Sequence, residues 1–182
     1  MTGMNPDPAI GLLTIACIAL LFASAAVHKL RDLKGFDEIF AAYGVLPTAL
    51  ARLSRAVPIL EFAVAVGLLI PASRRYAAAA GIALLLVYAA AIAVNLRRGR
   101  RDLACGCGGP NERRPIAAWM VWRNIAIAAA ATIALATWTA RPLNITDAVT
   151  VVFGLLSIAL AYLCADQLLA HAQRGQRLRS LR

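Results

Sequence analysis

The chain has 182 residues, of which 61% are hydrophobic and 15% charged, and its mean hydropathy is +0.70. Soluble domains are about 45–50% apolar and about 25% charged, so this composition excludes a soluble globular domain. The net charge of +10 comes without a nucleic-acid recognition element, and its basic residues cluster at the ends of hydrophobic blocks, which indicates partnership with anionic lipid and not with nucleic acid.

The hydrophobic residues fall into five blocks along the chain. A helix that crosses about 30 Å of hydrocarbon needs about 20 mainly apolar residues, and the blocks approach that length. They predict membrane spans at about residues 10–27, 50–70, 76–96, 116–139 and 148–169. Pro58 is expected to kink the second span. We therefore expect an all-α integral membrane protein with a single membrane domain over residues 1–182.

A shorter amphipathic stretch lies between the first two blocks. Its apolar residues recur at spacings of three and four, which predicts an interfacial helix over about residues 33–44. Gly44 and Pro47 are expected to end this helix.

Five spans place the two termini on opposite sides of the membrane. With the N-terminus outside, and with Arg123 left out because it lies inside a block, fifteen Lys and Arg residues are on the inner side. Only Arg74, Arg75 and Arg141 are then on the outer side. The positive-inside rule predicts this orientation in the bacterial inner membrane, with a cytoplasmic C-terminus and the polar loop 97–115 at the cytoplasmic face.

The long polar loop at residues 97–115 contains Cys105-Gly106-Cys107. The single glycine between the cysteines lets the backbone fold sharply enough to bring the two sulfurs together. A disulfide in so small a ring departs from ordinary geometry and is expected to be easily reduced. Arginines on both sides of the pair favour the reactive thiolate. The pattern indicates an exchange-active dithiol, with Cys105 and Cys107 as the catalytic candidates.

Other interpretations of the cysteines stay open. A structural zinc site takes four ligands, and this loop offers two cysteines and no histidine, so zinc requires a second chain. An inert pair of loop cysteines is the other alternative. Cys17 and Cys164 lie inside spans and are expected to be small apolar packing residues. No resident metal or cofactor is expected.

Ionisable side chains inside spans are costly and often mark function or pairing. Glu61 is the clearest example, and it has three candidate partners in Arg123, His28 and Lys29. The pair is either functional or a structural ion pair that fixes helix packing. Hydrogen bonds from Asn95 and Asn124 are expected to join this network.

The coupling site of a transporter is a further possibility for Glu61. The sequence has no pair of glycine-broken or proline-broken helices in matching halves, which disfavours a transporter.

Several short motifs occur in a recognisable order. They are His28-Lys29-Leu30-Arg31-Asp32-Leu33, Leu46-Pro47, Pro58 with Glu61, Asn95-Leu96, Arg98-Gly99-Arg100, Cys105-Gly106-Cys107-Gly108-Gly109 and Trp122-Arg123-Asn124. In this order the chain resembles the methylamine utilisation protein MauE family, a relative of the DoxX-like membrane proteins. It departs from the pattern at Ala104, where the family is expected to carry an acidic residue before the first cysteine.

The resemblance implies a DoxX-like four-helix transmembrane bundle, here with a fifth transmembrane helix and the interfacial helix. It implies a role in processing, export or folding of the methylamine dehydrogenase β (small) subunit, with a thioredoxin-like partner protein. In this interpretation the surrounding arginines, Arg100 among them, tune the thiolate, and Glu61, Arg123 and Asn124 hold the helices beneath the loop. A non-enzymatic scaffold or export helper is the competing class.

The implied client is periplasmic, whereas the charge distribution places the cysteines inside. Either the protein carries reducing equivalents across the membrane, or the number of spans differs from five.

Overall fold

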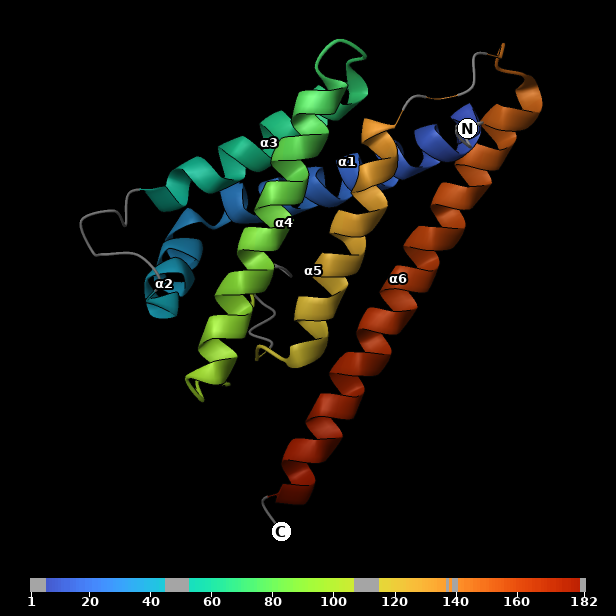
Figure 1. Cartoon of the computed structure of the whole chain (residues 1–182). Helices are drawn as coiled ribbons and strands as arrows, with labels where there is room; N and C mark the ends of the chain where they lie inside the picture. The colour runs from blue at the N-terminus through green and yellow to red at the C-terminus, as the bar shows by residue number, and fades with distance from the viewer. Residues whose placement is uncertain (1–5, 45–52, 107–114, 137, 139–140, 181–182) are drawn as a thin grey trace.

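The computed structural model describes residues 6–44, 53–106, 115–136, 138 and 141–180, and these ranges are helical apart from connecting turns and one isolated bridge between Ala104 and Pro115 (Figure 1). The elements are α1 (Pro8–Arg31), α2 (Leu33–Tyr43), α3 (Ala56–Leu69), α4 (Arg74–Arg97), α5 (Ala118–Ala131), the short 3-10 helix η2 (Thr132–Leu135) and α6 (Ile145–Ser180). The all-helical class expected from the sequence is confirmed for this part of the chain.

Four helical segments of the described residues are long and apolar enough to cross a membrane. They are Pro8–Arg31, Arg74–Arg97, Ala118–Leu135 and Ile145–Ala165. The chain is therefore a multi-pass membrane protein by length and composition. The fourth predicted block ends earlier than expected, because regular helix stops at Leu135.

Helix α3 occupies the second predicted block, but it has 14 residues and a length of about 21 Å. It nevertheless runs from one end of the bundle to the other. Ser54, just before α3, donates a hydrogen bond to Asp37 of α2 (2.6 Å). Arg74, just after α3, lies 4.7 Å above the ring of Trp138, which belongs to the far end. Whether α3 is a full span stays a prediction.

The predicted kink at Pro58 is wrong for the described residues. Pro58 lies in the first turn of α3, and a 3-10 turn at residues 53–55 precedes the helix. The first N–H groups of an α-helix have no partner within the helix, so proline is tolerated there without breaking a hydrogen bond.

Local sequence sets where α1 and α2 begin and end. Asp7 caps α1 by accepting a hydrogen bond from the Ala9 N–H (2.8 Å), and Pro8 follows at the first helical position. Asp32 ends α1 and caps α2 by accepting from the Gly35 N–H (3.0 Å). Gly44 ends α2 with a φ of 57°, a left-handed conformation that glycine adopts without strain.

The two ends of the bundle differ. We call the end that carries α2 and residues 97–106 the loop end. We call the end that carries the α3–α4 turn and Trp138 the opposite end. Between them α1, α3, α4 and α5 share a core of small and large apolar residues. Gly81 of α4 illustrates the close packing, since a Cβ there would lie 3.0 Å from a Phe22 ring carbon.

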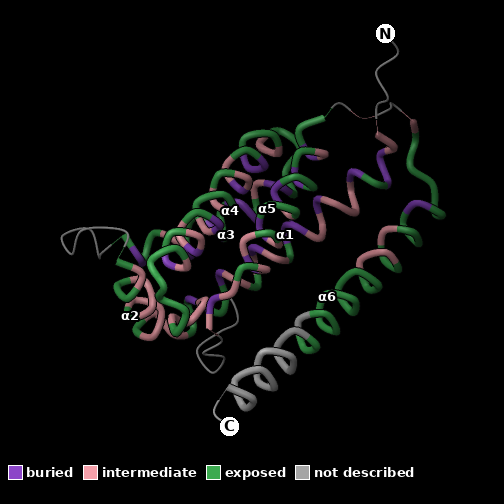
Figure 2. The backbone as a smooth tube through the Cα atoms, turned by 60° about the horizontal axis from the view of Figure 1, so that its bottom comes forward, coloured by how far each residue is buried: buried purple, intermediate pink, exposed green. Residues whose placement is uncertain are grey.

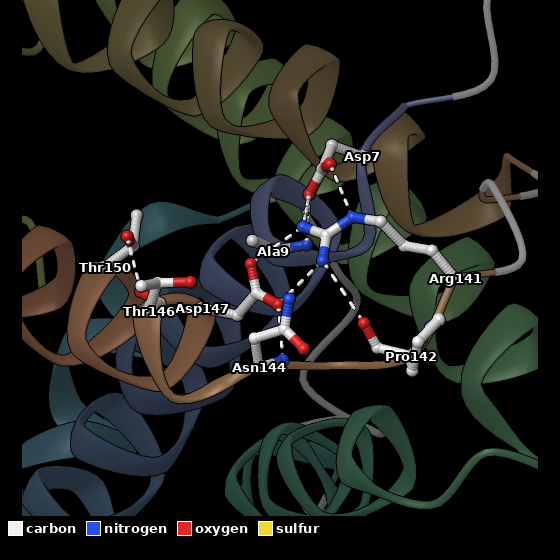
Figure 3. Close-up of polar contacts among 8 residues, drawn as sticks. All are labelled: Asp7, Ala9, Arg141, Pro142, Asn144, Thr146, Asp147 and Thr150. Carbon is white, nitrogen blue, oxygen red and sulfur yellow. Dashed lines mark hydrogen bonds and ion pairs between the residues drawn. The ribbon is translucent and has the colours of Figure 1, made fainter.

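Helix α6 lies at the edge of the bundle, and most of its described residues are exposed (Figure 2). It leans on α1, where Gly154 faces the side chain of Leu13. Its start is fixed by Arg141, whose guanidinium lies between two carboxylates (Figure 3). Arg141 Nη2 is 2.8 Å from Asp7 Oδ1 and 2.7 Å from Asp147 Oδ1. This ion pair network joins the beginning of α1 to the beginning of α6.

We predict that Asp7→Asn loosens this junction in a pH-dependent way. The hydrogen bonds from Arg141 and from the Ala9 N–H hold the pKa of Asp7 below its usual value. Stabilisation by Asp7 is therefore present above the unfolded pKa of about 3.9 and is lost as pH falls through the lower folded pKa. The unfolding temperature of the variant should lie below that of the wild type at pH 7, and the gap should close in acid. Glu38→Gln, which removes an exposed carboxylate of α2, is the control and should show no such gap.

Candidate functional site

The described part of the C-G-C segment packs against helix α2 through Gly106. Gly106 has a φ of 70°, and a Cβ there would lie 3.2 Å from Ile39 Cγ2 and 3.9 Å from Phe36 Cε2. A side chain at this position would be strained and crowded, so the glycine is needed for the close approach. Cys105 is half-buried and packs against the cluster of Ile92, Ile116 and Met120. Cys107 lies outside the described residues.

Asn95 and Arg100 fasten the C-terminal end of α2 to α4. The last carbonyls of a helix lack partners inside the helix and need donors from elsewhere. Asn95, which is completely buried, donates through Nδ2 to the Tyr43 carbonyl (3.1 Å). Arg100 donates through Nη2 to the Ala42 carbonyl (2.7 Å) and through Nη1 to Asn95 Oδ1 (3.2 Å). The loop that carries Cys105 and the helix beneath it are thereby held together.

Asp37 gives α2 a second attachment. One of its carboxylate oxygens accepts the hydrogen bond from Ser54, and the other lies 3.7 Å from Arg55 Nε. Ser54 is only 1% exposed, so this contact is shielded on the serine side, whereas Arg55 is exposed. Helix α2 is thus connected on one side to the start of α3 and on the other side to the end of α4.

A buried ion pair lies below α2. The ammonium of Lys29, at the end of α1, contacts the carboxylate of Glu61 on α3, and both residues are buried. Tyr88 of α4 donates its hydroxyl to the same oxygen, Glu61 Oε1 (2.8 Å). A buried charge is tolerated only when it is paired and hydrogen-bonded, and here three helices supply the partners.

Aromatic rings complete the surroundings of the lysine. The Lys29 Nζ lies 5.3 Å from the ring centroid of Phe36 and 5.3 Å from that of Tyr88. A cation at this distance from a ring is attracted by the ring quadrupole. Because Phe36 also lies against Gly106, it links the ion pair to the beginning of the cysteine loop.

Glu61 had three candidate partners, and the structure pairs it with Lys29. His28 is exposed. Arg123 donates instead to the Tyr162 hydroxyl of α6 (3.2 Å) and lies 5.3 Å from the Trp119 ring. Of the three candidates the structure selects Lys29, which is buried at the last turn of α1, whereas its neighbour His28 is exposed.

The two asparagines were expected to join the Glu61 network. Asn95 belongs to the α2 attachment and not to the ion pair, because it lies about two turns further along α4 than Tyr88. Asn124 is 4% exposed, and its Nδ2 has no hydrogen-bond partner among the described residues.

Sequence reasoning missed Tyr88 and the contact role of Phe36. A tyrosine in the middle of an apolar block is a usable signal, because a buried hydroxyl requires a partner. The described residues contain no cluster of three or more His, Cys, Asp or Glu side chains that is placed to hold a metal ion.

The comparisons with known proteins agree on one family. The model of the family described as methylamine utilisation protein MauE matches residues 7–139. The chain belongs to the MauE family. A MauE protein of Paracoccus denitrificans is 39% identical over 154 residues, which cover 83% of this chain and 82% of the relative. One of Methylophilus methylotrophus is 33% identical over 169 residues, covering 91% and 89%. No solved structure matches the chain.

The region matched by the MauE family model has a clear structural meaning. It begins at the cap of α1 and reaches just past Trp138, so it contains the ion pair, α2 and the C-G-C segment. Helix α6 lies beyond it. The residues grouped at the loop end therefore all belong to the part that defines the MauE family.

We predict that the protein loses stability when one partner of the ion pair is removed and regains it when both are removed. Glu61→Leu leaves a buried ammonium, and Lys29→Met leaves a buried carboxylate, so each should lower the free energy of unfolding by about 3–5 kcal/mol. The double variant should regain most of the loss. Titration with sodium dodecyl sulfate in mixed micelles, followed by tyrosine and tryptophan fluorescence, measures this. A double variant as unstable as either single variant contradicts the prediction.

Proposed function

We propose that this protein is a membrane maturation factor of methylamine utilisation that exchanges thiols and disulfides through Cys105 and Cys107. The observation that carries the proposal is Gly106 of the C-G-C sequence, which lies against α2 in a left-handed conformation at the basic end of the bundle. The client is the methylamine dehydrogenase β subunit, and the partner is a thioredoxin-like protein. The MauE relatives support the pathway, since their names place them in methylamine utilisation.

The exchange needs no resident cofactor. A thiolate of one protein attacks a sulfur of the other protein's disulfide, forms a mixed disulfide and releases the second sulfur as a thiolate. A second attack within the mixed species completes the transfer. Two electrons and two protons pass from the dithiol to the disulfide, so one partner leaves oxidised and the other reduced. The thioredoxin-like partner then returns Cys105 and Cys107 to their starting state by the same steps.

The arginines next to the pair serve two purposes in this proposal. Arg98 and Arg100 donate to backbone carbonyls at the end of α2, so they position the segment. Arg97 and Arg101 are exposed and remain available to stabilise a thiolate or to attract an acidic partner.

The half-burial of Cys105 favours exchange with a selected partner. A reactive thiol is usually partly exposed in an electropositive setting, while a fully buried cysteine is inert. Contact with Ile92 and its neighbours holds one side of Cys105. Attack is thereby restricted to the open side of the loop.

The decisive test replaces both cysteines by serine in cells that make methylamine dehydrogenase. Accumulation of the mature β subunit should fall at least tenfold, and its remaining cysteines should become available to an alkylating gel-shift reagent. The matched control is Cys17→Ala/Cys164→Ala, which removes two cysteines from the spans and should leave accumulation unchanged. Normal accumulation in the double-serine strain removes the redox function.

The same strain distinguishes a scaffold from a redox protein. A scaffold would keep working without the two thiols and would depend on the exposed charges. Arg97→Glu/Arg101→Glu tests this without disturbing α2, because the carbonyl contacts belong to Arg98 and Arg100. Loss of the β subunit in the charge-reversed strain together with normal levels in the double-serine strain supports the scaffold.

We propose that the protein sits in the bacterial inner membrane with its N-terminus outside and the loop end facing the cytoplasm, so that the exchange with the β subunit takes place before the subunit is exported. The positive charge at the loop end supports this orientation. In a Cys17→Ala/Cys164→Ala background, a membrane-impermeant maleimide should label Cys105 or Cys107 only after permeabilisation. A cysteine introduced at Ala72, exposed in the α3–α4 turn, should be labelled in intact cells. Labelling of the loop cysteines in intact cells places them with the periplasmic client and reverses the orientation.

A further inference from the structure

The opposite end of the bundle carries an open cavity of about 350 Å³ that the proposed thiol chemistry does not use. It is lined by Pro71, Arg74, Arg75, Ala134, Ala136 and Trp138. The lining comes from the α3–α4 turn, the first turn of α4 and the chain just after η2. Two cations therefore face an otherwise apolar hollow.

The charges of this cavity are not neutralised within the described residues. Of the three arginines at the opposite end, Arg141 is held between two carboxylates. Arg74, by contrast, makes one long hydrogen bond from Nε to the Leu68 carbonyl (3.5 Å), and Arg75 makes no hydrogen bond or ion pair to any described residue. The terminal nitrogens of both guanidinium groups are thus available to an anion from outside the chain.

The wall of the cavity is fixed in advance. The Trp138 indole donates through Nε1 to the Ile133 carbonyl (3.2 Å), and its ring lies 4.7 Å from the Arg74 guanidinium carbon. The ring also fills the space beside Gly11 of α1, where any Cβ would overlap it. A site whose side chains are already ordered loses little freedom when a ligand binds.

The cavity lies at the level where phospholipid headgroups are found. Arg74 begins one span-like helix, and Ala136 and Trp138 directly follow another that ends at Leu135. Aromatic and basic residues at the ends of spans meet the headgroup region, and the apolar walls match the beginning of an acyl chain. A phosphate held by two guanidinium groups is a strong, charge-assisted contact.

From this arrangement we propose that the cavity binds the headgroup of one anionic phospholipid, with Arg74 and Arg75 on the phosphate and Trp138, Pro71 and Ala136 against its glycerol and acyl portion. Such a lipid joins the α3–α4 turn to the segment that leads into α6. This binding site is independent of the thiol chemistry and of the basic residues at the loop end.

The test uses the full chain purified in detergent micelles. It is titrated separately with dioleoyl phosphatidylglycerol and dioleoyl phosphatidylcholine, and one-to-one complexes are counted by native mass spectrometry. The wild type should hold one phosphatidylglycerol at least several-fold more tightly than phosphatidylcholine, and excess inorganic phosphate should not displace it. Equal binding of the two lipids, or full displacement by inorganic phosphate, overturns the proposal.

Variants locate the binding. Arg74→Gln/Arg75→Gln should weaken phosphatidylglycerol binding by about tenfold or more, as expected for the loss of a charge-assisted hydrogen bond. Arg74→Lys/Arg75→Lys should retain part of it. The matched control, Arg31→Gln/Lys34→Gln, removes two exposed charges at the loop end and should bind as the wild type does.

A second variant protects the test against a folding defect. Ala136→Trp keeps both arginines and fills the cavity, so it should also lose the bound lipid. The site is refuted if Ala136→Trp and the double glutamine variant both bind phosphatidylglycerol with wild-type affinity. It is also refuted if the control variant Arg31→Gln/Lys34→Gln loses binding to the same extent.

Discussion

A lysine and a glutamate that leave water together constrain the whole loop end of this bundle. Burial of either charge alone costs several kcal/mol, so α1 and α3 must stay in the register that brings Lys29 to Glu61. Tyr88 extends the requirement to α4 through its hydroxyl. Phe36 extends the same constraint to α2, because its ring lies beside the Lys29 ammonium and against Gly106. The position of Gly106 thus depends on a charge pair inside the membrane domain.

Helix α2 is held in a fixed position beneath the loop by contacts with its neighbouring helices. It buries no residue completely, and by itself such a short amphipathic helix would be held only by the membrane surface. Asp37 fixes it to the start of α3, and Asn95 with Arg100 fixes its last carbonyls to the end of α4. Of the four arginines at residues 97–101, Arg98 and Arg100 donate to backbone carbonyls at the end of α2, while the exposed Arg97 and Arg101 lie on either side of them. Structure and surface charge are therefore supplied by different arginines of one basic segment.

The opposite end of the bundle also carries arginines, but they have different surroundings. Arg141 lies between two carboxylates and fixes the start of α6, which also packs on α1 and accepts a hydrogen bond from Arg123 at Tyr162. Arg74 and Arg75 lack such partners among the described residues and border an open cavity. Equal formal charge at these positions thus has unequal consequences, because neutralisation depends on which acidic residues the fold brings within reach.

The sequence by itself determined the membrane class, the helical content and the basic loop with its cysteines, because apolar block length, helical periodicity and charge clustering are local properties. The bounds of α2 also follow from local signals, namely the Asp32 cap and Gly44. Only the tertiary structure decided that Lys29, and not its neighbour His28 or the distant Arg123, meets Glu61. It alone assigned Asn95 to α2 and revealed Tyr88. Pairings between helices depend on their rotation about their own axes, and a shift of one residue turns a side chain by about 100°, which no local pattern specifies to that accuracy.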